Sequence, residues 1–249
     1  MTHSNKAQMA AAAYRLPAMD MDFLLGDTTR ALRFQLEYMK AEEHLRKWGV
    51  ATTVIVFGSA RIQPGEAKGW YEAAREFARI CSEEGGAKFT DALPRQNVIA
   101  TGGGPGIMEA ANRGAYDAGA PSIGFNITLP REQEPNASST PDLTFRFHYF
   151  AMRKMHFAIR AAALVVFPGG FGTMDELFEI LTLRQTGKMD DALPVVLYDS
   201  QFWKGLINFR QFVDAGVVSE ADLDLFGFAD SPRQAWDELL QRGLKVSRE

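Results

Sequence analysis

The feature that most constrains the fold is a buried strand followed directly by a glycine loop and a helix, at residues 165–176. Residues 161–167 form a continuous apolar run, which is typical of a parallel strand covered on both faces. Thr173 is then expected to open an amphipathic helix. The loop between them is Pro168, Gly169, Gly170, Phe171 and Gly172. Such a loop directs free N–H groups and the positive end of a helix dipole at one point, which suits a phosphate.

The same arrangement occurs twice earlier in the chain. The apolar run 52–57 is followed by Gly58 and Ser59, and the run 97–101 is followed by glycines at 102–104. In open α/β sheets, ligands bind at the carboxyl ends of the strands, although each turn alone could be a plain tight connection. Together they favour one ligand site, formed by Gly58, Ser59, Gly102, Gly103, Gly104 and the third loop. Ile107 breaks the dinucleotide fingerprint, and no Gly-Lys-Ser/Thr completes a Walker A loop.

Strands alternate with helices along the rest of the chain, which predicts a single-domain Rossmann-like doubly wound parallel sheet with an N-terminal helical extension. Further strands are expected at 122–127, 143–150, 193–198 and 223–228, and helices at 20–48, 64–84, from 152, at 202–213 and at 232–243. The expected organisation is a flexible tail at 1–19, the extension at 20–50, a core at 51–200 and C-terminal helices at 201–249.

Composition excludes several classes of protein. The net charge of −4 and a pI near 5.7 give no general attraction to nucleic acid. No apolar run approaches the roughly 18 residues that span a bilayer. The single cysteine, Cys81, fits a reducing cytoplasm and lies in the apolar pattern of a helix, where packing is the simpler role. We therefore expect a cytoplasmic protein without membrane or nucleic-acid partners.

Three charged residues near the loops could take part in chemistry. Thr173-x-x-Glu176 matches a capping box, so Glu176 could cap the helix, contact a ligand, or both. Arg153 and Lys154 form a basic pair of the kind that is usually solvated, yet Arg153 follows a strand end where it could meet a phosphate. There is no metal-binding cluster and no Gly-x-Ser-x-Gly elbow, so neither a metal nor a cofactor is expected.

Taken together, these motifs resemble the LOG family, the cytokinin riboside 5′-monophosphate phosphoribohydrolases long mislabelled lysine decarboxylases. The resemblance is carried by Gly102–Ala110, by Arg153-Lys154 and by Pro168–Glu176, with support from Phe57–Arg61 and Gln185–Lys188 of the longer bacterial type. It implies a Rossmann-like protein, usually a homodimer or larger, that cleaves the N-glycosidic bond of a nucleoside 5′-monophosphate. The products are a free base and ribose 5-phosphate.

The resemblance also implies roles for individual residues. Arg153 and Glu176 match the catalytic pair of the family. Thr173 and the loop before it would hold the 5′-phosphate, and Lys154 would belong to the same binding site. The first two glycine loops would line the nucleotide, with Gly58-Ser59 near the base or ribose. Ala151-Met152 departs from the plant-type residues before Arg153, so the resemblance extends to the chemistry and not to the preferred base.

Two other functions remain open. Molybdenum cofactor carriers of the same superfamily hold a phosphate-bearing pterin in a similar cleft without catalysis. A pyridoxal-phosphate decarboxylase would need a Schiff-base lysine, and Lys154 is the only lysine among the site motifs.

Overall fold

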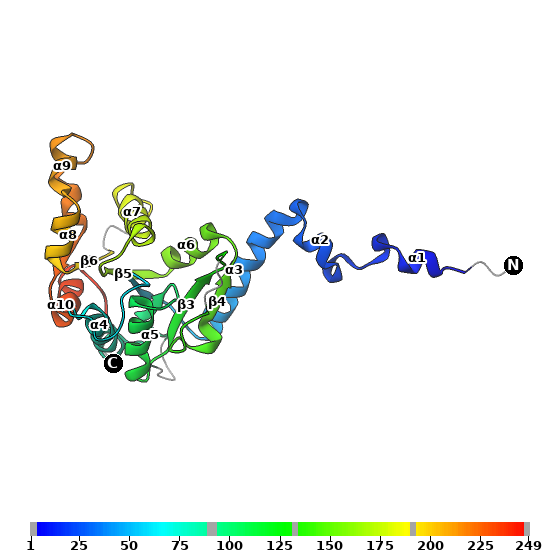
Figure 1. Cartoon of the computed structure of the whole chain (residues 1–249), viewed down its shortest axis with the longest axis horizontal. Helices are drawn as coiled ribbons and strands as arrows, with labels where there is room; N and C mark the ends of the chain where they lie inside the picture. Colours follow the sequence, from blue (N-terminus) through cyan, green and yellow to red (C-terminus); the bar gives the residue numbers. More distant parts are fainter. Residues whose placement is uncertain (1–3, 89–93, 131–133, 190–192, 247–249) are drawn as a thin grey trace. The chain divides into compact units, whose positions relative to one another are not determined.

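The structure is a computed structural model that describes residues 4–88, 94–130, 134–189 and 193–246 (Figure 1). The chain forms two compact units, Met1–Lys40 and Ala41–Glu249. The boundary falls inside one helix, α3 (Arg30–Lys47), whose last turns belong to the second unit. The boundaries expected from the sequence, at residues 19, 50 and 200, remain predictions.

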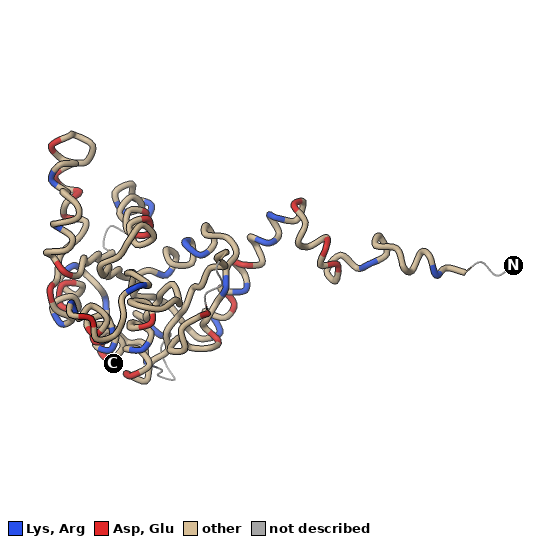
Figure 2. The backbone as a smooth tube through the Cα atoms, in the orientation of Figure 1, with Lys and Arg blue, Asp and Glu red and all other residues tan. Residues whose placement is uncertain are grey.

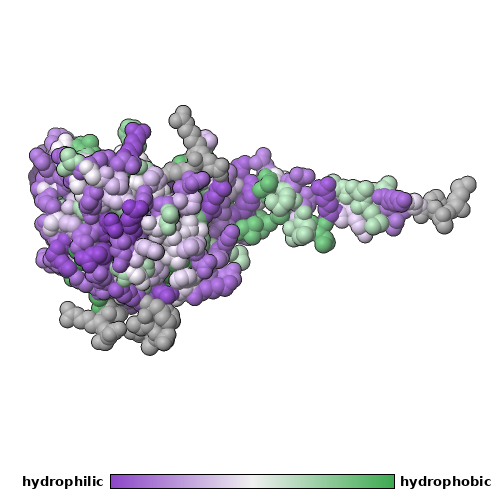
Figure 3. All heavy atoms as spheres, turned by 60° about the horizontal axis from the view of Figure 1, so that its bottom comes forward, coloured by the Kyte–Doolittle hydropathy of each residue, from purple (hydrophilic) through white to green (hydrophobic). Residues whose placement is uncertain are grey.

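The first unit is helical, and its surface carries many apolar side chains. It contains α1 (Lys6–Ala10), α2 (Met21–Leu25), three short 3-10 turns and the start of α3. Many of its large apolar side chains are exposed: Met9, Tyr14, Leu16, Met19, Met21, Phe23, Leu25, Leu32, Leu36 and Met39. Figure 3 shows hydrophobic patches in green along this part of the chain. The helical region expected at 20–48 is interrupted at Gly26, which has an extended backbone and separates α2 from the next turn.

The second unit is built on a seven-stranded sheet in which every pairing is parallel. The order across the sheet is β4-β3-β2-β1-β5-β6-β7. The strands are β1 (Thr53–Phe57), β2 (Val98–Thr101), β3 (Ser122–Ile127), β4 (Thr144–Phe147), β5 (Ala161–Val166), β6 (Val195–Tyr198) and β7 (Gly227–Ala229). This arrangement confirms the predicted Rossmann-like doubly wound parallel sheet.

Helices cover both faces of the sheet, so the central strands are apolar on both sides (Figure 1). Val54 and Val56 of β1 pack with the layer formed by α4 (Trp70–Glu84), α5 (Ile107–Asp117) and α10 (Pro232–Gln241). Ile55 and Phe57 face the layer that includes α6 (Phe150–Ile159), α7 (Phe171–Gln185) and α8 (Ser200–Leu206). Alternate side chains of one strand therefore enter two cores, which is why the sequence shows a continuous apolar run.

The chain reverses its direction across the sheet at β1. From β1 it proceeds through β2 and β3 to the edge strand β4, and then returns to place β5 on the other side of β1. The loops that leave β1 and β5 therefore diverge to opposite faces. The crevice between them is the position where doubly wound folds bind ligands.

Several element boundaries differ from those expected. α4 begins at Trp70 and not near residue 64, because Gly65 and Gly69 have positive φ. The single helix expected at 202–213 is two helices, α8 and α9 (Phe209–Asp214), since the Asn208 side chain caps α9. The strand expected at 223–228 is a 3-10 turn, η5 (Glu220–Leu225), followed by β7. The helix expected from residue 152 begins at Phe150.

Candidate functional site

The three glycine loops meet at the crevice, where backbone hydrogen bonds join them. The Ser59 N–H donates to the Pro168 carbonyl at 3.0 Å, and the Ile107 N–H donates to the Ser59 carbonyl at 3.1 Å. Glycine is required for this approach. A Cβ on Gly58 would lie 2.6 Å from Ile107, and one on Gly106, whose φ is +71°, would lie 2.4 Å from the Ser59 oxygen. The loop after β1 is thus held between the other two.

A cavity of about 290 Å³ opens beside the joined loops. Nine of the residues predicted for the site line it: Gly58, Ser59, Gly102, Gly104, Arg153, Gly170, Gly172, Thr173 and Glu176. We call this cavity the cleft. Its lining comes from the loops after β1, β2 and β5, from the end of β3 and the residues after it, and from α5, α6 and α7, so residues more than a hundred positions apart share it.

Five predicted site residues do not line the cleft. Pro168 accepts the Ser59 N–H, and a Cβ on Gly169 would lie 2.1 Å from Thr173 Oγ1. Gly103, with φ +69°, packs against the amide of Asn126. Phe171 is 97% exposed. Lys154, the fifth, forms ion pairs outside the cleft.

The charged centre of the cleft is an ion pair between two helices. Arg153 Nη2 on α6 donates to Glu176 Oε1 on α7 at 2.7 Å, and both side chains are largely buried. Burial raises the pKa of Glu176 to about 7, although the positive charge of Arg153 opposes the shift. The carboxyl therefore changes charge near neutral pH. Arg153 Nε is buried without a hydrogen-bond partner among the described residues, which leaves a donor for a ligand in the cleft.

The N-terminus of α7 faces the cleft without a capping side chain. The helix begins at Phe171, with Gly170 as the N-cap residue, so Thr173 is its third residue and not its cap. The capping-box interpretation of Thr173 and Glu176 is therefore wrong, because Glu176 pairs with Arg153. The first N–H groups of a helix have no partner within it. Here those of Phe171, Gly172 and Thr173 can bind an anion.

Lys154 points away from this centre. Its Nζ lies 2.7 Å from Asp175 and 3.3 Å from Glu179. Burial lowers the pKa of Lys154, but hydrogen bonds to the two carboxylates outweigh it and raise the pKa overall. The lysine stays protonated, and Glu179 faces it rather than the cleft.

The sequence reasoning missed several residues of the cleft. Asn126 at the end of β3 and Met108 in α5 both line it, together with Ala60, Arg61, Ile127 and Leu129. Asn126 had one available signal, since it is a polar residue at the carboxyl end of a buried strand. Met108 had no such signal in the sequence, because its position in the cleft depends on how α5 packs against the loop after β2.

Elsewhere, the described residues contain no group of three or more His, Cys, Asp or Glu that could hold a metal ion. Cys81 is fully buried, as packing predicted, and burial raises the pKa of its thiol. No helix in the described parts of the chain is long and apolar enough to cross a membrane. Figure 2 shows basic and acidic residues interspersed along the chain rather than separated by sign.

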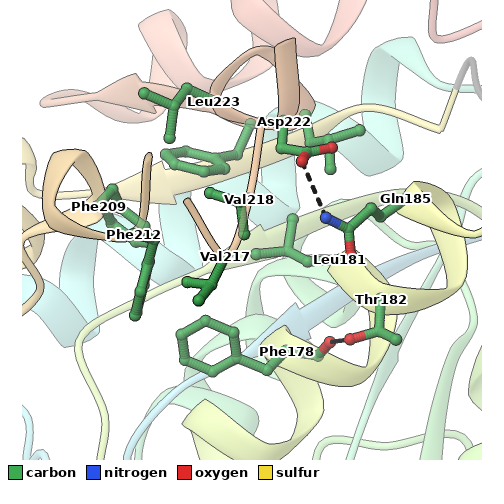
Figure 4. Close-up of a pocket in the computed structure, with 12 residues that line it drawn as sticks. Phe178, Leu181, Thr182, Gln185, Phe209, Phe212, Val217, Val218, Asp222 and Leu223 are labelled. Carbon is green, nitrogen blue, oxygen red and sulfur yellow. Dashed lines mark hydrogen bonds between the residues drawn. The ribbon is translucent and has the colours of Figure 1, made fainter. Parts of the chain in front are cut away.

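A second cavity of the same volume, about 290 Å³, lies along the later turns of α7. We call it the groove. Aromatic and aliphatic side chains from α7, α9 and the segment up to η5 line it (Figure 4): Phe178, Leu181, Phe209, Phe212, Val217, Leu223 and Phe226. At its wall, Gln185 Nε2 donates to Asp222 Oδ2 at 2.9 Å, and the Thr182 hydroxyl donates to the Phe178 carbonyl at 2.7 Å (Figure 4).

Comparison with protein families identifies one that matches a large part of the chain. The model of the family described as "possible lysine decarboxylase" matches residues 108–239, which are 132 of the 249 residues. The matched part includes Arg153, the third glycine loop and Glu176.

Curated relatives of the chain include phosphoribohydrolases of plants. A cytokinin riboside 5′-monophosphate phosphoribohydrolase of Arabidopsis thaliana is 25% identical over 186 residues, covering 68% of this chain and 85% of its own length. A probable enzyme of the same name from Oryza sativa subsp. japonica is 25% identical over 147 residues, covering 58% of this chain and 63% of the relative.

Solved structures share the fold. The structure of TM1055, a structural genomics target, has a TM-score of 0.52 at 19% identity and covers 76% of this chain and 99% of its own. The molybdenum cofactor binding protein of Rippkaea orientalis has a TM-score of 0.51 at 18% identity, covering 76% and 94%. At these identities the likeness concerns the fold alone.

Proposed function

The chain belongs to the LOG family, the family of the "possible lysine decarboxylase" model, and on that premise we propose that it hydrolyses the N-glycosidic bond of a purine nucleoside 5′-monophosphate. Water and the nucleotide would give the free base and ribose 5-phosphate. The observation that carries the proposal is the buried ion pair of Arg153 with Glu176, beside the uncapped N-terminus of α7.

The phosphate would bind at the N-terminus of α7. Backbone N–H groups of the first turn and the Thr173 hydroxyl are available there, and the helix dipole favours an anion. No described side chain makes a capping hydrogen bond at this terminus. Binding at the phosphate is distant from the bond that breaks, so its free energy can position the ribose for reaction.

Glu176 would act on the ribose. Departure of the base leaves an oxocarbenium-like sugar with positive charge at C1′. A carboxylate in a site shielded from water stabilises such a charge far more than it would in solution, and it can also orient the attacking water. Arg153 fixes the position of this carboxylate and favours its ionised form, which burial alone would disfavour.

A decarboxylase does not fit the residues present. Pyridoxal phosphate needs a lysine whose amine can lose its proton and reach the cofactor. No lysine lines the cleft in the described part of the chain, and Lys154 is held by two carboxylates. The family description therefore gives a poor guide to the chemistry of this site.

Assembly and substrate range belong to the same proposal. We propose a homodimer or larger homo-oligomer, supported by the exposed apolar side chains of the first unit. AMP and an isopentenyladenine riboside 5′-monophosphate are the proposed substrates, in keeping with the names of the plant relatives. Light scattering of the purified protein would measure its mass.

The direct test is to incubate the protein with each nucleotide and separate the products by chromatography. Equal amounts of free base and ribose 5-phosphate would support the proposal. Nucleotide binding without release of base from either substrate would contradict it and favour a carrier function. Mass spectrometry of the protein as purified would then detect a bound pterin.

A further inference from the structure

The amide of Asn126 lies at the junction of two cavities. It lines the cleft, and it also lines an adjoining cavity of about 450 Å³ over the ends of β3 and β4. Ile127 and Leu129 are shared by both cavities as well. The second cavity is completed by Thr144, Phe145 and Arg146 of β4 and by Glu134 and Pro135. The cleft therefore continues past Asn126 instead of ending there.

The amide of Asn126 makes one hydrogen bond to another described residue. Nδ2 points to the Gly124 carbonyl at 3.5 Å, a long hydrogen bond within the same strand. The amide rests on Gly103, where a Cβ would lie 2.3 Å from Nδ2, and a Cβ on Gly124 would lie 3.3 Å from it. Oδ1 receives no hydrogen bond from any described residue and is not among the buried polar atoms. An open acceptor thus faces the cavity.

The strand order places this acceptor at the far end of a bound nucleotide. β3 is separated from β5 by β2 and β1, which amounts to three strand spacings or about 14 Å. A phosphate at the N-terminus of α7, which follows β5, leaves the ribose beside the loops after β1 and β2. An extended nucleoside monophosphate then brings its base to the end of β3.

We propose that Asn126 is the residue that selects the base, by accepting a hydrogen bond from the exocyclic amino group of a 6-aminopurine. This inference rests on the proposed function, because it takes the nucleotide orientation from it. With Nδ2 directed at the Gly124 carbonyl, a 6-oxopurine would place its own carbonyl oxygen against Oδ1, and two acceptors repel. The adjoining cavity of about 450 Å³ would give room beyond the amino nitrogen.

The test compares AMP with IMP, which differ at this position of the base. Turnover and binding of both nucleotides are measured for the wild type, Asn126→Leu and Asn126→Asp, with circular dichroism to verify folding. We expect the wild type to prefer AMP by about tenfold or more in kcat/KM, the value of one hydrogen bond. Asn126→Leu should lose about tenfold on AMP and little on IMP, whereas Asn126→Asp keeps an acceptor and should keep the preference.

The outcomes separate this inference from the proposed function. Two results would overturn the role of Asn126 and leave the hydrolase proposal standing. One is an equal fall in the turnover of AMP and IMP in Asn126→Leu, and the other is a wild type that prefers IMP. No turnover by the wild type, together with tighter binding of AMP that Asn126→Leu abolishes, would reject the hydrolase and retain Asn126 as the residue that reads the base.

Discussion

α7 borders two cavities of equal volume, about 290 Å³ each, which differ in the chemical groups that line them. The cleft at its N-terminus combines uncapped N–H groups with the buried pair of Arg153 and Glu176. The groove along its later turns is lined by aromatic and aliphatic side chains. Volume therefore does not distinguish a site for chemistry from a gap between packed elements. Hydrogen-bond donors without partners and a carboxyl with a shifted pKa are what distinguish such a site.

The largest expected effect separates two glutamates on neighbouring turns of α7. Glu176→Gln should lower kcat by about a thousandfold, because the amide cannot stabilise positive charge at C1′. Glu179→Gln is the matched control, since Glu179 pairs with Lys154 outside the cleft. Release of base from AMP measures both. Equal activity of the two variants would remove the distinction between the cleft and the rest of the helix.

The second effect concerns stability as a function of pH. The pKa of Glu176 rises from an ordinary 4.5 to about 7 on folding, so the folded protein binds this proton more tightly than the unfolded chain. The contribution to the free energy of unfolding is full below about pH 4.5 and is lost as the pH rises through 7, by about 3 kcal/mol. The free energy of unfolding of Glu176→Gln should not show this decrease, because glutamine does not titrate.

Urea unfolding at pH 5 and pH 8 tests this expectation. The stability of Glu176→Gln relative to the wild type should increase between the two pH values, whereas Glu179→Gln should follow the wild type. The pKa of Asp222 in the groove shifts in the opposite direction from that of Glu176, because hydrogen bonds from Ser219 lower it. A relative stability of Glu176→Gln that stays constant with pH would show that the carboxyl is ionised throughout.

A smaller effect is expected at the phosphate end of the cleft. Thr173→Val keeps the shape of the side chain but removes its hydroxyl, so KM for AMP should rise by about tenfold with kcat almost unchanged. Thr182→Val on the same helix is the control, as its hydroxyl bonds to the Phe178 carbonyl at 2.7 Å. A fall in kcat alone would place Thr173 with the reacting atoms instead of the phosphate.

The smallest effect is expected in the groove. Phe212→Ser removes an aromatic ring that is 36% exposed at the groove wall. We expect kcat/KM for AMP to stay within about twofold of the wild type and the free energy of unfolding to fall by about 1 kcal/mol. A large loss of turnover would show that the two cavities are coupled through α7.

Local sequence patterns were sufficient for the fold class and for most of the cleft. β5 occupies 161–166 where 161–167 was expected, because a buried parallel strand needs a continuous apolar run. The three loops were found because close backbone contact requires glycine, as at Gly58 and Gly106. Both signals are local in the sequence.

What failed depended on tertiary structure. The capping box at Thr173 was a coincidence of residue types, since the helix starts two residues earlier and Glu176 finds Arg153 from another element. Asn126 ends a buried strand, but it was missed because its place beside the other loops depends on the strand order, which brings β3 to the cleft. The pKa of Glu176 depends on burial by several segments, which no residue spacing encodes.

The pairing of β1 with β5 has a consequence for how the chain is made. These strands are adjacent in the sheet, yet the whole segment from Gly58 to Arg160 lies between them in sequence. Until the ribosome has delivered β5, β1 has one unpaired edge, which invites association with other chains. A nascent chain that stops before Ala161 would carry two glycine loops and no crevice. Nucleotide binding should therefore begin only after α7 has been synthesised. Before that point, a chaperone that binds the incompletely formed sheet would prevent its unpaired edge from associating with other chains.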